Sequence, residues 1–314
     1  MWLQIRLYLL LGLMFAIIYA IVVVVLRTMG IGTLVVYAVI ASLMLLLQYL
    51  IAPKLVELSM RVHYVSESEH PELHRMVSEL AAEAGIPKPR VGISNIPVPN
   101  AFAFGRWLGD GRVCVTRSLL GLLNQKELRA VLGHEISHLK HRDVMVITTL
   151  SIVPMICWLI AWSLMFSGNR NRGNIVLLGA AAFALYFITN LLVLYASRIR
   201  EYYADRGSVK LGNQPHHLAS ALYKLVYGSA RTPEHVVKEV QGYKAFFLND
   251  PSRALDEIQE LSQVDVDRTG TIDSAELAAL SQKRIRVGLA DKMLELFSTH
   301  PNMLKRIKHL STLA

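Results

Sequence analysis

Gly133-His134-Glu135-Ile136-Ser137-His138 places two imidazoles and a carboxylate close together on a segment that we expect to be helical. Residues four apart lie on one face of a helix, so His134 and His138 can offer ring nitrogens to one metal ion. Glu135 then projects beside them, where a carboxylate can deprotonate water that a zinc ion has made acidic. The run predicts a hydrolytic zinc site. The alternative is that both histidines are ordinary polar residues on a helix surface.

The helix that carries this run has clear start signals. Asn124 is a suitable N-cap, and Glu127 completes a capping box three residues later. Apolar residues then follow at helical spacing: Leu128, Val131, Leu132, Ile136 and Leu139. The histidine pair therefore lies on the kind of element that metal binding requires.

Composition indicates an integral membrane protein. The chain has 314 residues, of which 53% are hydrophobic. Four uncharged apolar stretches are long enough to cross a bilayer, namely residues 7–26, 31–51, 144–166 and 175–197. The first lacks a small-residue cleavage pattern, so we interpret it as a retained anchor rather than a signal peptide.

The four spans form two hairpins, 1–52 and 144–197, and leave the segments 53–143 and 198–314 on one side of the membrane. Basic residues flank the span ends on that side: Arg6, Lys54, Lys140, Arg142, Arg198 and Arg200. The two opposite loops carry only Arg27, Arg170 and Arg172. The positive-inside rule predicts a multi-pass protein of the cell membrane with both termini and the zinc site in the cytoplasm.

Charge and cysteine content exclude other classes. The net charge of +9 divides into +2 for 53–143, +3 for 198–314 and +4 for Arg6 with the three arginines of the opposite loops. No concentrated basic face indicates nucleic acid, and the mild excess favours an anionic lipid bilayer as partner. Cys114 and Cys157 lack the spacing of a thiol motif, and a disulfide framework is not expected.

The end of the fourth span supplies a third metal ligand. Glu201 lies about four residues beyond the span, and His138 lies about six residues before the third span, so both leave the bilayer at similar height. If the motif helix runs on into that span, the metal lies roughly 9 Å outside the hydrocarbon. Asp205, one turn after Glu201, is placed to accept a hydrogen bond from a ligand histidine. The alternative for Glu201 is an ion pair with a neighbouring arginine.

Outside the membrane we expect an α+β fold that is mostly helical. The residue pattern of the first soluble segment predicts a helix at 71–84 and strands at 90–94, 99–104 and 112–115. The second segment predicts helices almost throughout, apart from 228–242 and an acidic loop at 265–276.

The acidic loop matches the twelve-residue calcium loop of an EF-hand, with Gly270 at the sharp turn. Its oxygen donors would be Asp265, Asp267, Thr269, Asp273 and Glu276, with the carbonyl of Thr271. Only one such loop is present, whereas EF-hands generally work in pairs. Calcium is therefore a second candidate cofactor, and the alternative is an Asp-rich turn that caps a helix.

Four motifs in fixed order resemble the HtpX-type membrane zinc metalloproteases of the M48 group, which also contains Ste24 and Oma1. They are Asn100-Ala101-Phe102-Ala103, His134-Glu135-Ile136-Ser137-His138, Glu201-Tyr202-Tyr203-Ala204-Asp205 and Ser298-Thr299-His300-Pro301. The resemblance implies a zincin-like domain and a zinc metalloendopeptidase that degrades damaged or misfolded membrane proteins. Membrane proteins or unfolded polypeptides would be its substrates. Ste24 has more spans, so prenylated substrates are not expected.

The resemblance also assigns roles by position. His134, His138 and Glu201 match the ligands of one zinc ion per chain, and Glu135 matches the catalytic base. Asn100, Ala101, Phe102 and Ala103 match an edge strand that pairs with the substrate backbone. From the residues alone, Phe102 and Phe104 fit a structural core equally well.

His300 and Arg306 match groups that help hold the substrate or the oxyanion. From sequence alone, His300 before Pro301 is an ordinary helix-start signal.

A different functional class also remains open, namely a membrane-anchored calcium or metal sensor, or an inactive protease homologue that acts as a binding module. A structural zinc site would need a fourth protein ligand, and no obvious candidate is present, so the sequence favours the enzyme.

Overall fold

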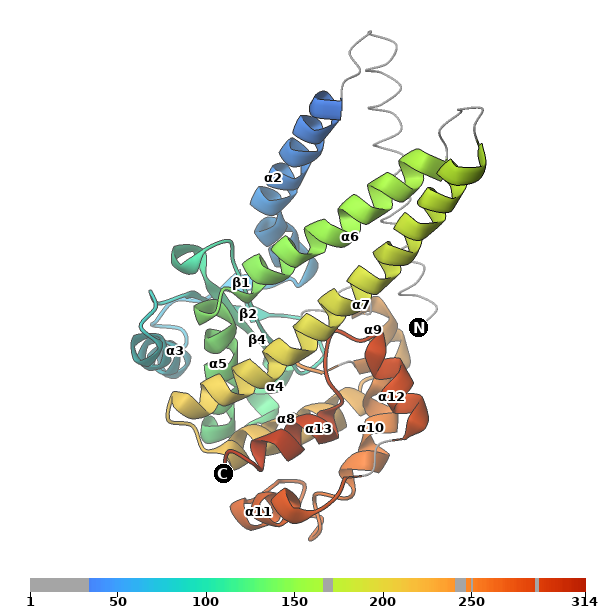
Figure 1. Cartoon of the computed structure of the whole chain (residues 1–314). Coiled ribbons are helices and arrows are strands. Elements are labelled where there is room, and N and C mark those ends of the chain that lie inside the picture. Colours follow the sequence, from blue (N-terminus) through green and yellow to red (C-terminus); the bar gives the residue numbers. More distant parts are fainter. Residues whose placement is uncertain (1–33, 166–171, 241–246, 250, 286–287) are drawn as a thin grey trace.

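The computed structural model describes residues 34–165, 172–240, 247–249, 251–285 and 288–314. A globular part carries the sheet and most helices, and three long helices extend away from it (Figure 1). These are α2 (Leu34–Ser59), α6 (Asp143–Met165) and α7 (Arg172–Lys210). The predicted span at 7–26 lies outside the described residues.

A four-stranded sheet has the order β1-β2-β4-β3. Its strands are β1 (Val62–Tyr64), β2 (Arg90–Ser94), β3 (Ala101–Phe104) and β4 (Arg112–Thr116). The pair β2 and β4 is parallel, while β1 and β3 pair antiparallel with their neighbours. The three predicted strands are present. Strand β1 was not predicted, because three residues are too few to show an alternating pattern.

Helices surround this sheet. The first soluble segment contributes α3 (Pro71–Ala84), the 3₁₀ turn η1 (Leu108–Asp110), α4 (Arg117–Leu122) and α5 (Gln125–Lys140). The second contributes α8 (Pro215–Ala230), α9 (Glu234–Val240), the 3₁₀ turn η3 (Pro251–Arg253), α10 (Ala254–Leu261), α11 (Ser274–Gln282), α12 (Leu289–Leu296) and α13 (Met303–Leu310). The fold outside the long helices is therefore α+β and mostly helical, as predicted.

The prediction that 228–242 is not helical is wrong for 228–230 and 234–240; residues 231–233 connect the two helices, and 241–242 lie outside the described residues. Helix α8 runs through Gly228, and α9 begins just after Pro233. Gly228 is required by close packing rather than by a helix end, because a Cβ there would lie 2.8 Å from Pro99. A proline at a helix start costs little, since the first amide groups have no partner within the helix.

The main core joins helices from both soluble segments. Leu80 of α3, Leu132 of α5, Leu222 of α8 and Ile307 of α13 are all fully buried in one cluster. Each such side chain stabilises the fold by about 1.5–3 kcal/mol. The two segments thus share one core although the 144–197 hairpin separates them in sequence, and this shared core fixes α5 relative to α7 and α13.

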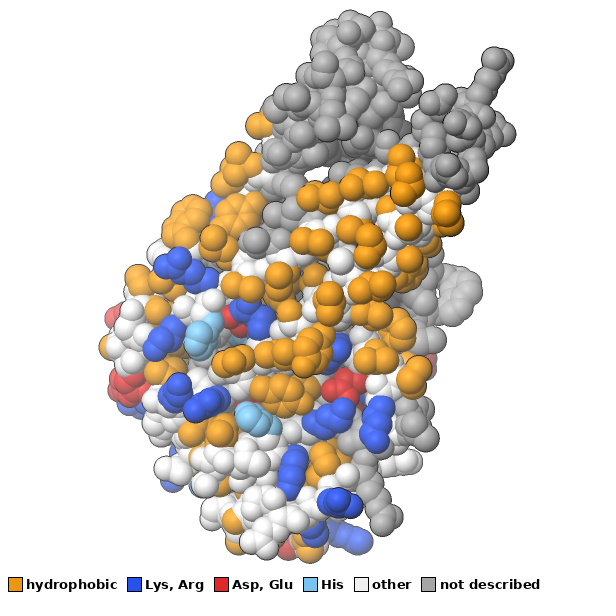
Figure 2. All heavy atoms as spheres, in the orientation of Figure 1, with side chains coloured by type: hydrophobic (Ala, Val, Ile, Leu, Met, Phe, Trp, Pro, Cys, Tyr) orange, Lys and Arg blue, Asp and Glu red, His pale blue; other side chains and the backbone are white. Residues whose placement is uncertain are grey.

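Helices α6 and α7 pack against each other and expose apolar side chains along their length (Figure 2). Among the exposed residues are Val153, Ile156, Ile160, Leu185, Ile188 and Leu192. Among the described residues, one helical segment, Leu177–Lys210, is long and apolar enough to cross a membrane by itself. Four spans therefore stay a prediction.

The motif helix does not continue into the third predicted span. Helix α5 ends at Lys140, and α6 begins at Asp143. Between them Arg142 has a φ of 55°, in the left-handed region that interrupts a right-handed helix. The expectation of one continuous helix is therefore wrong, and the height of the metal cannot be read from residue rise. The break instead turns Asp143 back toward His138, which a straight helix would not do.

Candidate active site

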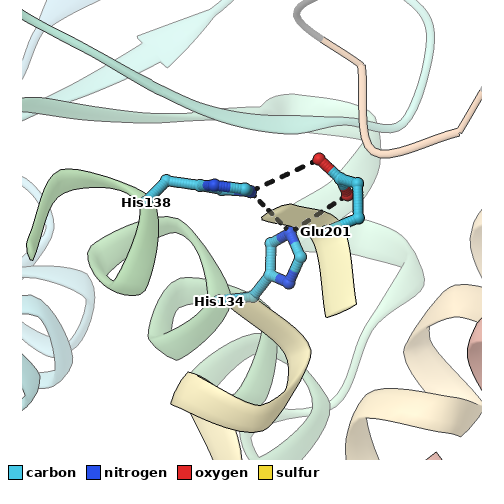
Figure 3. A group of neighbouring side chains, drawn as sticks. All are labelled: His134, His138 and Glu201. Carbon is cyan, nitrogen blue, oxygen red and sulfur yellow. Dashed lines mark hydrogen bonds and ion pairs between the residues drawn. The ribbon is translucent and has the colours of Figure 1, made fainter. Parts of the chain in front are cut away.

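His134, His138 and Glu201 converge on one point (Figure 3). The Nε2 atoms of the two histidines are 3.0 Å apart, and a Glu201 carboxylate oxygen lies 3.6 Å from His134 and another 3.5 Å from His138. The histidines come from α5 and the carboxylate from α7. One ligand atom from each residue lies within 4.8 Å of the others, so the group can hold one metal ion.

The start of α5 forms as the sequence predicts. Asn124 accepts a hydrogen bond from the backbone N–H of Glu127, and the Glu127 carboxylate accepts one from the backbone N–H of Asn124, both at 3.0 Å. Glu127 also accepts hydrogen bonds from Ser220 and Lys224 of α8. The capping box therefore fixes the start of α5 and ties it to the neighbouring helix.

Small residues allow α5 and α7 to approach each other. A Cβ added at Gly133 would lie 2.9 Å from the Ser208 hydroxyl oxygen, and one at Gly207 would overlap the Ser137 hydroxyl. The Ser208 hydroxyl donates to the carbonyl of Ala130 at 2.6 Å across the same contact. This close crossing brings Glu201 within reach of the histidines.

Each histidine is oriented by a carboxylate at its other ring nitrogen. His134 Nδ1 lies 2.9 Å from Asp205 Oδ1, in the arrangement that the sequence predicts. His138 Nδ1 lies 2.5 Å from Asp143 Oδ2, and Arg200 forms an ion pair with Asp143. Sequence reasoning missed Asp143. An acidic residue between the motif and an apolar span was the available signal.

These contacts fit a bound cation. Both Nδ1 atoms face carboxylates, so the Nε2 atoms, 3.0 Å apart, are the ring nitrogens that would present lone pairs to a metal ion once it displaces the second proton of His134. Oε2 of Glu201 is buried and, among the described residues, accepts no hydrogen bond in good geometry, although Arg306 Nη1 lies 3.1 Å away. A metal ion is the group that would satisfy two facing lone pairs and this oxygen together.

Burial and charge shift the pKa values of the α5 side chains. Burial alone would lower the pKa of His134, but hydrogen bonds to Asp205 and Glu201 raise it to about 9. Burial and the neighbouring His134 lower the pKa of His138 to about 4. Burial raises the pKa of Glu135, which is 4% exposed. Glu135 is thus a carboxyl group with increased basicity beside the ligand cluster.

Arg306 lies behind the ligands. It is fully buried, donates to both oxygens of Asp205 at 2.7 and 3.0 Å, and donates to the carbonyl of Leu248 at 2.9 Å. These contacts indicate a residue that positions Asp205 and Glu201. Its expected role in holding the substrate or the oxyanion stays a prediction.

His300 lies at the edge of the ligand group. Its Nε2 atom is 3.9 Å from Glu201 Oε1, and its Nδ1 atom is 3.0 Å from the Thr299 hydroxyl. The following helix, α13, is capped by Asn302 rather than started at Pro301. The segment before α13 is thus a connection that brings an imidazole near the ligands.

Strand β3 is an edge strand, with β4 as its neighbour in the described sheet. The N–H of Thr116 donates to the carbonyl of Asn100, so these two opposite residues are a hydrogen-bonded pair of the antiparallel ladder. Every second pair along the ladder is bonded in the same way, so Phe102 bonds to Cys114. Ala101 and Ala103 then direct their N–H and C=O groups toward the open edge. Ala103 is partly exposed, whereas Ala101 is 1% exposed, so within the described residues this edge is accessible at Ala103.

The side chains of this segment serve the fold. Asn100 is fully buried and accepts a hydrogen bond from the N–H of Leu248 at 2.9 Å. Phe102 and Phe104 are buried, with ring centroids 5.9 Å apart. The structural alternative for the two aromatic residues is therefore confirmed, and any substrate contact of β3 would be made by its backbone.

The acidic loop at 265–276 gathers the carboxylates of Asp265, Asp267 and Glu276 within 4.8 Å. Asp265 accepts hydrogen bonds from the backbone N–H groups of Thr269 and Gly270 and from the hydroxyl of Tyr223. The hydroxyls of Thr269 and Thr271 lie 3.1 Å apart.

Asp273 of the same loop caps α11 in a capping box with Glu276. The helix-capping alternative is confirmed for Asp273 and Glu276, and calcium binding by this loop stays a prediction.

Comparison with known proteins identifies the family. The sequence profile of Peptidase family M48 matches residues 67–314. A protease HtpX homolog of Methanothermobacter thermautotrophicus is 59% identical over 224 residues, which cover 71% of this chain and 86% of that protein. A protease HtpX homolog of Moorella thermoacetica is 35% identical over 283 residues, with 88% and 83% covered.

A solved structure shares the fold. The crystal structure of S. mikatae Ste24p superposes with a TM-score of 0.53 at 15% identity, and the match covers 98% of this chain but 65% of that one. At this identity the likeness concerns the fold alone. The family profile spans most of the chain and the HtpX homologs match over most of their length, and the chain therefore belongs to peptidase family M48, among the HtpX-type metalloproteases.

Proposed function

We propose that the chain is a membrane-embedded zinc endopeptidase that hydrolyses damaged or misfolded membrane proteins at the cytoplasmic face of the cell membrane. The observation that carries the proposal is the convergence of His134, His138 and Glu201, with the buried Glu135 beside them on α5. Membership of a metalloprotease family agrees with this geometry.

His134, His138 and Glu201 are the proposed zinc ligands. Two imidazoles and one carboxylate form a ligand set typical of catalytic zinc, which keeps a further position open for water or substrate. A zinc ion in this place would supply a Lewis acid that polarises the scissile carbonyl and acidifies water. Asp205 and Asp143 hold the two imidazoles at Nδ1, which would leave both Nε2 atoms to ligate the ion.

Glu135 is the proposed proton carrier. Its carboxylate accepts a proton from the attacking water, and the resulting acid gives the proton to the nitrogen of the leaving amine. Because burial raises the pKa of Glu135, the carboxylate is a stronger base than an exposed glutamate. The same side chain can therefore serve as base and then as acid within one turnover.

The open edge of β3 is the proposed substrate platform. A polypeptide in extended form would pair with the outward N–H and C=O groups of the partly exposed Ala103, which is β-augmentation. Pairing at Ala101, which is 1% exposed, would require the groups that bury it to move. Such pairing selects an accessible backbone rather than a side-chain sequence. This preference suits unfolded or damaged polypeptides, whose backbones are free to form an added strand. His300, whose Nε2 atom lies 3.9 Å from Glu201 Oε1, is the proposed hydrogen-bond donor to the substrate or the oxyanion.

The membrane location rests on the apolar surface of α6 and α7. Their exposed apolar side chains resemble those of a lipid-facing hairpin rather than a soluble surface. Glu201 lies on the same helix as this surface, so the site is close to where α7 leaves its apolar part. The cytoplasmic orientation follows from the basic residues that flank the predicted spans.

The proposal is tested with the purified full chain in detergent and an unfolded membrane protein as substrate. We expect cleavage by the wild type, loss of cleavage with a chelator, and loss of cleavage in Glu135→Gln with the fold retained. Glu79→Gln, an exposed carboxylate on α3, is the matched control and should cleave normally. Equal cleavage by wild type and Glu135→Gln would refute the proposal.

A further inference from the structure

Helix α12 exposes an apolar face whose function the proposed mechanism does not explain. Met293, Leu296 and Phe297 are 60%, 46% and 57% exposed. Their spacing of three and four residues places them on one side of the helix. Glu295 is buried on the other side and forms an ion pair with Lys305 of α13. The apolar face therefore points away from the protein core.

Arg198 fixes the end of α12 to a defined place along α7. Its Nη1 atom donates to the carbonyls of Glu295 and Ser298, both at 2.8 Å, and to that of Leu296 at 3.3 Å. Arg198 is itself 7% exposed. Because Arg198 directly follows the apolar stretch 175–197, the C-terminus of α12 lies where the apolar part of α7 ends.

The exposed apolar surface of α7 approaches the same place. Leu192 and Tyr195 are 59% and 56% exposed, and the Arg198 guanidinium lies 5.8 Å from the Tyr195 ring. Tyrosine is enriched where a membrane helix passes from hydrocarbon to headgroups. Lys292, beside Met293, is also exposed and is a suitable partner for lipid phosphates. The surface thus continues from α7 onto α12 without leaving the predicted membrane boundary.

We infer that the face formed by Met293, Leu296 and Phe297 lies in the interface of the lipid bilayer, with α12 in the membrane plane beside α7. This inference rests on the proposed membrane location. Amphipathic helices bind such interfaces by burying their apolar side among headgroups and upper acyl chains. The bilayer is the occupant that fits, because the face lies at the end of an apolar span.

The position of α12 matters for the active site. The chain runs from Phe297 directly into Ser298, Thr299 and His300, and His300 Nε2 lies 3.9 Å from Glu201 Oε1. Arg198, which holds this segment, is one turn before Glu201 on α7. Two residues thus separate the apolar face of α12 from His300.

Spin labels on the full chain in vesicles of phosphatidylcholine and phosphatidylglycerol test the inference. In a Cys114→Ala, Cys157→Ala background, single labels are placed through Met293→Cys or Phe297→Cys. Leu192→Cys is the reference for the span, and Leu255→Cys, a 71% exposed position on α10, is the aqueous reference. Collision rates with oxygen and with a water-soluble nickel chelate are then compared. Zinc content of each labelled protein verifies the fold.

We expect labels at 293 and 297 to collide more with oxygen than with the nickel chelate, as at 192, and the reverse at 255. If labels at 293 and 297 collide mainly with the nickel chelate while the label at 192 collides mainly with oxygen, the inference is overturned and the proposed membrane location is unaffected. Shielding of 293 and 297 from both reagents would mean that a polypeptide covers the face, which also overturns it. Nickel collisions at 192 would contradict the membrane location itself.

Discussion

Asp143 Oδ2 lies 2.5 Å from His138 Nδ1, although Asp143 is the first residue of the apolar helix α6 and His138 belongs to α5. The left-handed backbone at Arg142 makes this contact geometrically possible. Arg200 of α7 pairs with the same carboxylate. The orientation of one proposed ligand therefore depends on both α6 and α7, and a movement of α6 against α7 would be transmitted to His138.

Removal of the Asp143 carboxylate should weaken metal binding. In Asp143→Ala the imidazole of His138 loses its acceptor, and we expect zinc affinity to fall by about 10- to 100-fold. Asp143→Asn keeps an acceptor oxygen and should lose less. Competition with a chromophoric chelator measures both affinities, and Glu79→Gln is the control. Unchanged affinity in Asp143→Ala would show that this contact does not orient the ligand.

Proline substitutions should distinguish the open edge of β3 from the edge that bonds to β4. Ala103→Pro removes an N–H that faces the open edge, so the sheet should keep its stability while KM for polypeptide substrates rises. Phe102→Pro removes an N–H that bonds to β4 and should lower the melting temperature. Peptidase kinetics and thermal unfolding, measured on both variants, check this contrast. Normal KM in a folded Ala103→Pro protein would argue against backbone pairing.

Arg306→Met should destabilise the fold, because it leaves the buried carboxylates of Asp205 and Glu201 without their cation. Loss of one partner of a buried ion pair costs about 3–5 kcal/mol. The double variant Arg306→Met, Asp205→Leu removes both charges and should recover part of that loss. Thermal unfolding of the two proteins measures the difference, with the exposed Arg75→Met as control. A melting temperature of Arg306→Met equal to wild type would contradict the positioning role.

Asp110 gives a pH-dependent contribution to stability. Burial raises its pKa, but hydrogen bonds from Arg106 and Arg112 lower it from 3.8 to about 2. A lowered pKa means that the stabilisation is complete above pH 3.8 and is lost as the pH falls toward 2. The melting temperature of wild type should therefore exceed that of Asp110→Asn at neutral pH, and the gap should narrow on acidification. A gap that widens at low pH would contradict this ion pair.

Local sequence signals, such as capping residues and apolar residues at helical spacing, predicted the helices in which they occur. The capping residues Asn124 and Glu127 and the apolar spacing after them predicted α5, and the motif spacing predicted that His134 and His138 share a face. Glu201 and Asp205 could be placed because they lie on one continuous helix, α7, after an apolar span. In each case the relevant distances are set within one helix.

Features that depend on the tertiary fold could not be predicted in this way. The contact of Asp143 with His138 depends on the backbone of Arg142, and arginine has no preference for the left-handed region. The burial of Arg306 depends on how α13 packs between α7 and α8, which no local pattern specifies. Strand β1 exists only because β2 supplies its hydrogen-bonding partner.

A zinc titration of chelator-stripped protein tests the central claim most directly. Wild type and Glu135→Gln are given increasing zinc while bound metal and cleavage of an unfolded membrane protein are followed together. We expect wild-type cleavage to rise and level off at one zinc ion per chain, while Glu135→Gln binds one ion and does not cleave. Full cleavage by wild type without bound zinc, or by zinc-loaded Glu135→Gln, would contradict the account.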